Sequence, residues 1–140
     1  MTMLPINLLA VIVAAVVAFV LGFLFHGPIS GKLWMKLANI HPTGNEKLAD
    51  MIPQMGLNLL SNLFTAYVLA VVYLFASTSP YGSVGAWGGI ATALWVWVGF
   101  LVTTTSIEVI WMGRSKKLWL FEAGCSFIVM IAMGAIIGSW

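Results

Sequence analysis

Charged side chains are scarce in this chain of 140 residues: six are basic and four are acidic, which together make 7% of the sequence. Water-soluble domains carry about 25% charged residues, because a globule in water needs polar groups to cover its surface. With 61% hydrophobic residues and so little charge, the chain cannot form such a surface. The composition predicts an integral membrane protein.

Metal-binding and nucleophilic residues are scarce too. Cys125 is the only cysteine, which rules out an intramolecular disulfide. The two histidines lack a His-x-x-x-His spacing, there is no Cys-x-x-Cys, and the one haem or metal alternative left is His26 as a lone axial ligand. No serine, histidine and acidic residue stand at a hydrolase spacing. We therefore expect no metal, no cofactor, no catalytic residue and no enzyme activity.

Long apolar runs are what the chain does contain. They cover residues 8–25, 52–76, 84–107 and 118–140. Each is close to the ~20 residues that a helix needs to cross about 30 Å of hydrocarbon. The sequence therefore predicts an all-α, integral membrane four-helix bundle that forms a single domain over residues 1–140.

Basic residues occur in only two of the three connections, namely the first, with Lys32, Lys36 and Lys47, and the third, with Arg114, Lys116 and Lys117. These connections share one face of a four-pass protein, and basic residues in short loops stay in the cytoplasm. We expect a cell (inner) membrane protein with both termini outside. The basic residues, Lys47 excepted, are expected to contact head groups of membrane lipids. They are too few, and too mixed with acidic residues, to indicate nucleic acid.

The first run ends at His26, because Gly27 and Pro28 disfavour a continuing helix. Apolar residues then alternate with Lys32 and Lys36, which predicts a short amphipathic helix at the cytoplasmic interface with Trp34 at head-group depth. Pro53 suits the first turn of the second helix.

Small residues recur every four positions in three of the runs. Such spacing places them on one helix face, where another backbone can approach closely. We expect these faces to pack helices together, within the chain or against a partner. The positions are Ala10, Ala14, Ala18, Gly22, Gly85, Gly89, Gly134 and Gly138.

Polar residues gather in the cytoplasmic half of each run when the direction of crossing is followed. They predict one buried pocket, and its candidate residues are His26, Asn58, Asn62, Thr104, Glu108, Glu122 and Ser126. Ionisable groups inside a membrane are costly and tend to face a bundle interior or water, so His26, Glu108 and Glu122 are the main candidates for relaying protons or holding a cation.

Two alternatives compete with a functional pocket. Glu108 and Glu122 lie within about two helical turns of Arg114, Lys116 and Lys117, which allows simple ion pairs at the membrane interface. The stripe that contains Asn58 and Asn62 is more typical of hydrogen bonds between membrane helices than of substrate binding.

Both ends of the chain resemble a known family. The stretches are Asn7-Leu8-Leu9-Ala10-Val11, Gly27-Pro28-Ile29-Ser30-Gly31-Lys32-Leu33-Trp34-Met35-Lys36, Lys117-Leu118-Trp119-Leu120-Phe121 and Met133-Gly134-Ala135-Ile136-Ile137-Gly138-Ser139-Trp140. They are similar to the signature of small four-span bacterial and archaeal membrane proteins catalogued as domain of unknown function 1761. Family members usually carry Trp-Tyr where this chain has Phe25-His26. The resemblance implies four helices and an unassigned activity.

The small-residue faces favour a structural or accessory subunit, which packs as a homo-oligomer or within a larger membrane complex. The alternative is a small oligomeric transporter or channel that passes protons, a cation or a small solute through the cytoplasm-facing pocket. A membrane enzyme has the least support, because no catalytic constellation is recognisable.

Overall fold

The computed structural model describes residues 5–140, and the regular structure within them is helical throughout. In chain order the elements are α1 (Leu8–Leu24), η1 (Phe25–Ile29), α2 (Gly31–Leu37), α3 (Leu48–Thr78), α4 (Gly85–Val96), η2 (Trp97–Val102), α5 (Thr103–Trp111) and α6 (Lys116–Ser139). The two η segments are wider π-type turns that continue the preceding helices. The predicted all-α bundle is confirmed.

Four helical stretches are long and apolar enough to cross a membrane: Leu8–Ile29, Leu48–Thr78, Gly85–Trp111 and Lys116–Ser139. The second begins four residues before the predicted start, so Pro53 lies inside α3 beyond its first turn and not in it. The third extends to Trp111 instead of residue 107. Thr103 and Thr105 tolerate this helical position because their hydroxyls donate to carbonyls of the preceding turn, those of Gly99 and Leu101.

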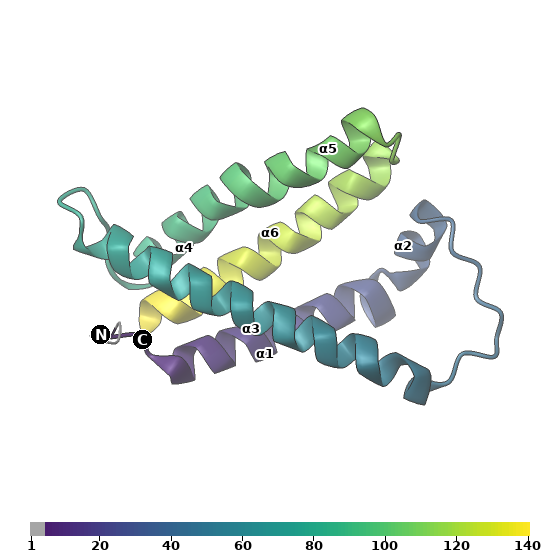
Figure 1. Ribbon diagram of the computed structural model, residues 1–140, viewed down its shortest axis with the longest axis horizontal. Helices are drawn as coiled ribbons and strands as arrows, with labels where there is room; N and C mark the ends of the chain where they lie inside the picture. Colours follow the sequence, from purple (N-terminus) through teal and green to yellow (C-terminus); the bar gives the residue numbers. More distant parts are fainter. Residues whose placement is uncertain (1–4) are drawn as a thin grey trace.

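Helix α6 is the centre of the bundle and packs against α1, α3 and α4 (Figure 1). Its contact with α4 is the closest, because glycines allow the two backbones to touch. A Cβ atom added at Gly134 would lie 2.7 Å from Cβ of Ala93 and even closer to the carbonyl oxygen of Gly89. The spacing of small residues therefore acts as predicted at this crossing, and it does so inside one chain.

The long helices pack closely at one end of the bundle and separate at the other. The start of α1 and the end of α6 lie at the same end as the α3–α4 connection (Figure 1). Toward the opposite end the α5–α6 hairpin diverges from α1 and α3, and α2 lies in the space between them (Figure 1). Helix α3 packs on α1, α4 and α6 but makes no extensive contact with η2 or α5. Residues of all four long helical stretches line a cavity in this part of the bundle.

The kink after α1 determines where α2 lies. Gly27 has φ −120° and ψ −105°, which breaks the helix where the Gly-Pro pair predicts an end. The chain turns back, and α2 packs against η1 and α6. Its Trp34 is half-buried, with its ring edge-on to His26 at a centroid distance of 5.2 Å. The tryptophan that the sequence places among lipid head groups is thus packed against the bundle.

Candidate functional site

A cleft of about 260 Å³ lies where the helices diverge. Five of the seven residues predicted to form a pocket line it: His26, Asn58, Asn62, Glu122 and Ser126. They come from η1, α3 and α6, and η2 adds Leu101. Because α1 and α3 run in opposite directions, the end of one meets the start of the other, which brings His26 and Asn58 to the same cavity.

The cleft has a polar end and an apolar floor. His26, Asn58 and Glu122 stand at the end nearest α2, while Ala18, Val129, Met130 and Met133 line the part nearer the middle of the bundle. From Glu122 to Met133 the lining extends over about 16 Å of α6, at 1.5 Å per residue. Met130 and Met133 are buried, so the cavity ends inside the protein.

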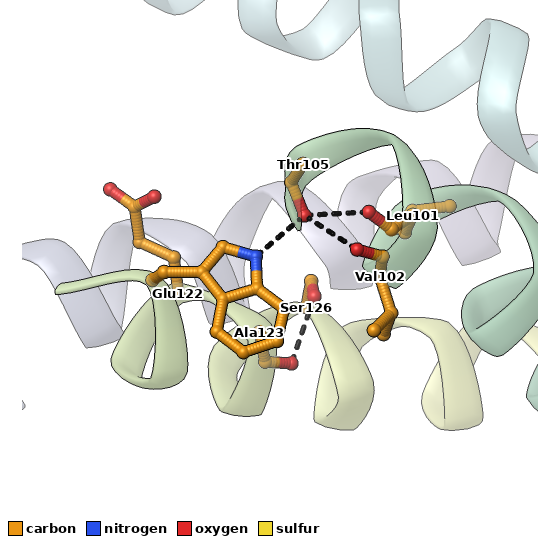
Figure 2. Close-up of a pocket in the computed structure, with 7 residues that line it drawn as sticks. Leu101, Val102, Thr105, Glu122, Ala123 and Ser126 are labelled. Atoms are coloured by element: carbon orange, nitrogen blue, oxygen red, sulfur yellow. Dashed lines mark hydrogen bonds between the residues drawn. The ribbon is translucent and has the colours of Figure 1, made fainter. Parts of the chain in front are cut away.

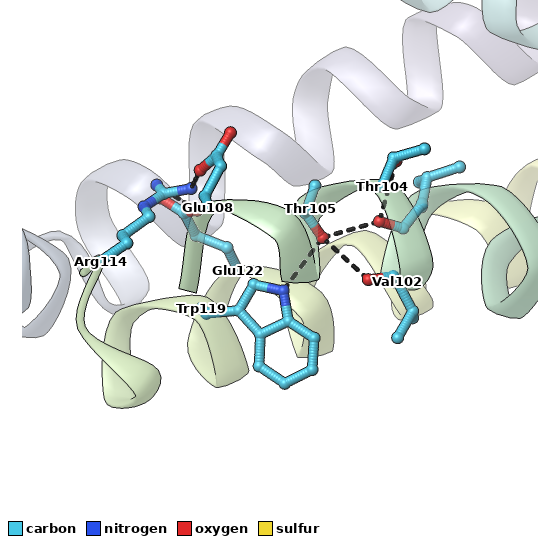
Figure 3. Close-up of polar contacts among 8 residues, drawn as sticks. Val102, Thr104, Thr105, Glu108, Arg114, Trp119 and Glu122 are labelled. Atoms are coloured by element: carbon cyan, nitrogen blue, oxygen red, sulfur yellow. Dashed lines mark hydrogen bonds and ion pairs between the residues drawn. The ribbon is translucent and has the colours of Figure 1, made fainter. Parts of the chain in front are cut away.

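Arg114 holds both of the predicted glutamates. Its guanidinium donates to Glu108, and its Nη2 lies 2.6 Å from Oε2 of Glu122 (Figure 3). The ion-pair alternative for these glutamates is therefore what the structure shows, with Arg114 as the partner of both. The side chain of Arg114, which the sequence predicts to contact lipid head groups, is 30% exposed and its guanidinium is engaged by these two carboxylates.

Glu108 and Thr104 do not line the cleft. Glu108 reaches Arg114 from α5, outside the cavity. Thr104 is exposed, and its hydroxyl donates to the carbonyl of Phe100 in its own helix. Helix α5 diverges from α3 at this end. The sequence pattern therefore predicts the position of both residues along the bundle axis correctly, but their side chains are on a face of the helix that does not line the cleft.

Two tryptophans form hydrogen bonds between α6 and the third span, and the sequence did not predict either as a site residue. Trp97 Nε1 donates to Ser126 Oγ at 2.9 Å, and Ser126 in turn donates to the carbonyl of Ala123. Trp119 Nε1 donates to Thr105 Oγ1 at 3.0 Å (Figure 3). Ser126 thus lines the cleft with its hydroxyl already engaged. A buried indole N–H usually has a hydrogen-bond partner, so a tryptophan inside an apolar run indicates an acceptor on a neighbouring helix.

A smaller cavity of about 150 Å³ adjoins these hydrogen bonds. Thr105, Glu122 and Ser126 border it, together with apolar groups of η2 and α6 (Figure 2). Glu122 therefore stands between the two cavities, since it lines both.

Asn58 and Asn62 bond to each other within α3. Asn62 Nδ2 donates to Asn58 Oδ1 at 3.1 Å, which is one helical turn away. This bond lies within one helix, and among residues 5–140 neither side chain bonds to another helix. The bond leaves Asn62 Oδ1 and Asn58 Nδ2 available to a ligand in the cleft.

His26 bonds to its own helix as well. Its Nδ1 lies 2.9 Å from the carbonyl oxygen of Gly22, and a carbonyl can only accept, so Nδ1 carries the proton. In neutral imidazole Nε2 is then an acceptor. The ring is held edge-on between Trp34 and Phe121.

Most of the predicted packing residues lie in the core. Ala10, Ala14 and Ala18 are at most 3% exposed, and Gly89, Gly134 and Gly138 are buried. Gly22 instead lines the cleft. Gly85 begins α4 with φ +76°, and its N–H donates to the hydroxyl of Tyr73 at 2.9 Å.

The remaining basic residues of the loops lie outside the cleft. Lys32, Lys36, Lys116 and Lys117 are exposed at the end where the helices diverge. Over residues 5–140, no three histidine, cysteine, aspartate or glutamate side chains come together as a metal site.

A protein-family model described as "Protein of unknown function (DUF1761)" matches residues 9–138, which is nearly the whole chain. No curated protein and no solved structure matches. The comparisons agree with the resemblance seen at both ends of the sequence, and the family description states no activity.

Proposed function

Because the chain belongs to the DUF1761 family, which has no assigned activity, we propose a function from its geometry: a small transporter of the cell (inner) membrane that binds its solute in the cleft. In this proposal both termini are outside, the cleft opens toward the cytoplasm, and the protein is not an enzyme. The orientation follows from the basic residues of the first and third connections.

The observation that carries the proposal is the cleft itself. Polar groups in a membrane bundle are costly unless they face water, each other or a ligand. Here His26, Asn62 and Glu122 converge on one cavity from three helical segments. A role limited to packing would need no cavity at this place.

A transporter fits the geometry better than a channel. The cleft ends at Met130 and Met133, and beyond it the glycine contact between α4 and α6 closes the bundle. A channel needs a continuous path, whereas a transporter exposes its site to one side at a time. The described shape corresponds to a state that is open to one side.

Flux in proteoliposomes tests the proposal. Purified protein is reconstituted, and uptake of protons, K⁺ and radiolabelled methylammonium is compared with protein-free vesicles. We expect at least one of these cations to enter faster than in empty vesicles, and Glu122→Gln to reduce that flux at least tenfold. Asp50→Asn is the matched control, because it removes one carboxylate of the first turn of α3 that does not line the cleft. Background flux for all three probes would contradict transport.

A structural or accessory subunit is the second candidate. The small-residue faces that suggested it are occupied inside the chain, so its support now comes from the third span. Only 11% of the most apolar window of that span is buried. Trp87, Trp95 and Trp111 are exposed along it. If a homo-oligomer or a larger membrane complex covers this face, Trp95→Ala should dissociate it. The molecular mass of the protein in native nanodiscs should then fall to that of the monomer.

A further inference from the structure

We propose that the ligand of the cleft is a small amphiphilic organic monocation, a protonated amine whose head lies at Glu122 and whose apolar tail points toward Met133. This inference rests on the proposed function, since it takes the cleft as the solute site and names the chemical class of the solute. Three properties of the cavity lead to it: its charge, its hydrogen-bonding groups and its apolar floor.

The charge at the polar end favours a monocation. Arg114 contributes one positive charge, and Glu108 and Glu122 contribute two negative charges, so the ion-paired group keeps one negative charge. Arg114 binds Oε2 of Glu122, which leaves Oε1 free on the carboxylate that lines the cleft. Exposed lysines stand at the same end, but they do not line the cavity. A ligand in the cleft therefore meets the partly exposed carboxylate of Glu122, which belongs to an ion-paired group with a net charge of −1.

The hydrogen-bonding groups favour a donor. Among residues 5–140, Glu122 Oε1 and Asn62 Oδ1 are acceptors without a partner, and His26 Nε2 is an acceptor when the ring is neutral. Ser126 is occupied by Trp97 and Ala123. An ammonium group has three donors and no acceptor, which matches this set. An anion or a carbonyl ligand would find as donors among these residues only the amide N–H groups of Asn58 and the second amide N–H of Asn62, and no positive charge.

The apolar floor favours a hydrophobic tail. Val129, Met130 and Met133 extend the cavity away from Glu122 along α6. Methionine is flexible and polarizable, so it adapts to tails of different shape. A cavity of about 260 Å³ is slightly smaller than the roughly 300–1,000 Å³ of typical ligand pockets, which restricts the tail to a short one.

The reactivity of Cys125, the only cysteine of the chain, can show whether a ligand occupies the cleft, and no mutation is needed. Cys125 lines the cleft and is half-buried. We propose to measure the rate at which methyl methanethiosulfonate modifies it, by intact-protein mass spectrometry, with increasing hexylammonium. Hexanoate and hexanol are controls with the same tail and a different charge. Equilibrium dialysis of radiolabelled hexylammonium gives a second measurement that does not depend on the thiol.

We expect hexylammonium to slow the modification of Cys125 in a saturable manner and to bind once per chain, with no effect of hexanoate or hexanol. Affinity should rise about fourfold for each methylene from butylammonium to hexylammonium. Glu122→Gln should weaken binding at least tenfold, because glutamine keeps an acceptor for Arg114 but removes the charge. Asp50→Asn should bind as the unmodified chain does.

Equal protection by hexanol or hexanoate, or an unchanged affinity in Glu122→Gln, would overturn this proposal. If vesicles take up protons or K⁺ while hexylammonium does not bind, the amine proposal fails and the transporter proposal stands. If hexylammonium binds and neither radiolabelled hexylammonium nor any of the other tested cations crosses the vesicle membrane faster than in protein-free vesicles, the ligand class is supported and transport is contradicted. Absence of both binding and flux contradicts both proposals.

Discussion

Arg114 Nη2 donates to Oε2 of Glu122 at 2.6 Å, so the only arginine of the chain fixes the carboxylate that lines the cleft. The same guanidinium binds Glu108 at the end of the third span. One side chain in the connection thus ties α5 to α6 at the end where the rest of the bundle diverges. The hydrogen bonds Trp97–Ser126 and Trp119–Thr105 also join the third span to α6.

Replacing Arg114 with glutamine should destabilise the protein, because two carboxylates would face each other without a counter-charge. Breaking a buried ion pair costs about 3–5 kcal/mol, and the partial exposure of all three groups lowers our expectation to about 1–3 kcal/mol. Unfolding in mixed micelles with increasing dodecyl sulfate measures the change. Lys116→Gln, which removes an exposed positive charge nearby, should change the free energy of unfolding little; equal effects of the two substitutions would show that the ion pair is unimportant.

Valine at Gly134 should disrupt the crossing of α4 and α6. Its Cβ would overlap the carbonyl of Gly89 and approach Ala93. Overpacking costs about 1–3 kcal/mol, and more where the obstacle is backbone. Gly124→Val is the matched control on the same helix, since a Cβ there meets nothing within 4 Å. We expect a lower unfolding transition for Gly134→Val and a nearly unchanged one for Gly124→Val; the reverse order would refute the described packing.

The Trp97–Ser126 hydrogen bond should have a measurable coupling energy. We expect about 0.6 kcal/mol, with an upper bound near 1.7 kcal/mol, from a double-mutant cycle with Trp97→Phe and Ser126→Ala. Trp97→Phe combined with Ser139→Ala is the control cycle, because the Ser139 hydroxyl donates to the carbonyl of Ala135 in its own helix. A coupling of zero in the first cycle would mean that the indole does not bond to Ser126 in the membrane.

The loop before α3 should lose order in acid. Hydrogen bonds from the backbone N–H of Thr43, the backbone N–H of Glu46 itself and the Thr43 hydroxyl lower the pKa of the Glu46 carboxyl. A lowered carboxyl pKa contributes stability above the unfolded pKa, and this stability is lost as pH falls through the folded value. Amide NMR signals of Thr43 and Gly44 should move together below about pH 4. Glu46→Gln should abolish the shift; an identical titration in this variant would exclude Glu46 as its cause.

Cysteine labelling should establish the orientation. In a Cys125→Ser background, Lys36→Cys and Lys116→Cys should resist a membrane-impermeant maleimide added outside intact cells. Ser79→Cys, in the exposed connection after α3, should react. The expectation follows from basic residues remaining in the cytoplasm. Labelling of position 36 or 116 from outside would reverse the orientation and move the cleft to the opposite side.

The helices and their order were predictable from the sequence because hydrophobic length is a local property. The end of the first run at Gly27-Pro28 was predictable for the same reason, since both residues restrict their own backbone. The start of α3 was not, because Leu48 to Met51 are neither long nor apolar enough to mark a span. They become helical as an extension of the helix that follows, which needs no new nucleus.

The site was predictable only in part. The sequence places the polar residues at similar positions along the bundle axis, and five of them line the same cavity. Thr104 lies outside it and Glu108 only reaches Arg114, since position along the axis does not determine which side of a helix faces inward. That depends on the crossing of α4 with α6, where contact between glycine backbones sets the rotation of the whole third span.

Taken alone, the sequence determined the membrane class, the four apolar helices and the family, because these depend on composition and on patterns within each segment. The tertiary structure decided that the small-residue faces are used inside the chain, that Arg114 belongs to Glu108 and Glu122, and that the cleft has a polar end and an apolar floor. These features depend on the packing of segments far apart in sequence, and the angle at which two helices cross is not encoded in either helix by itself.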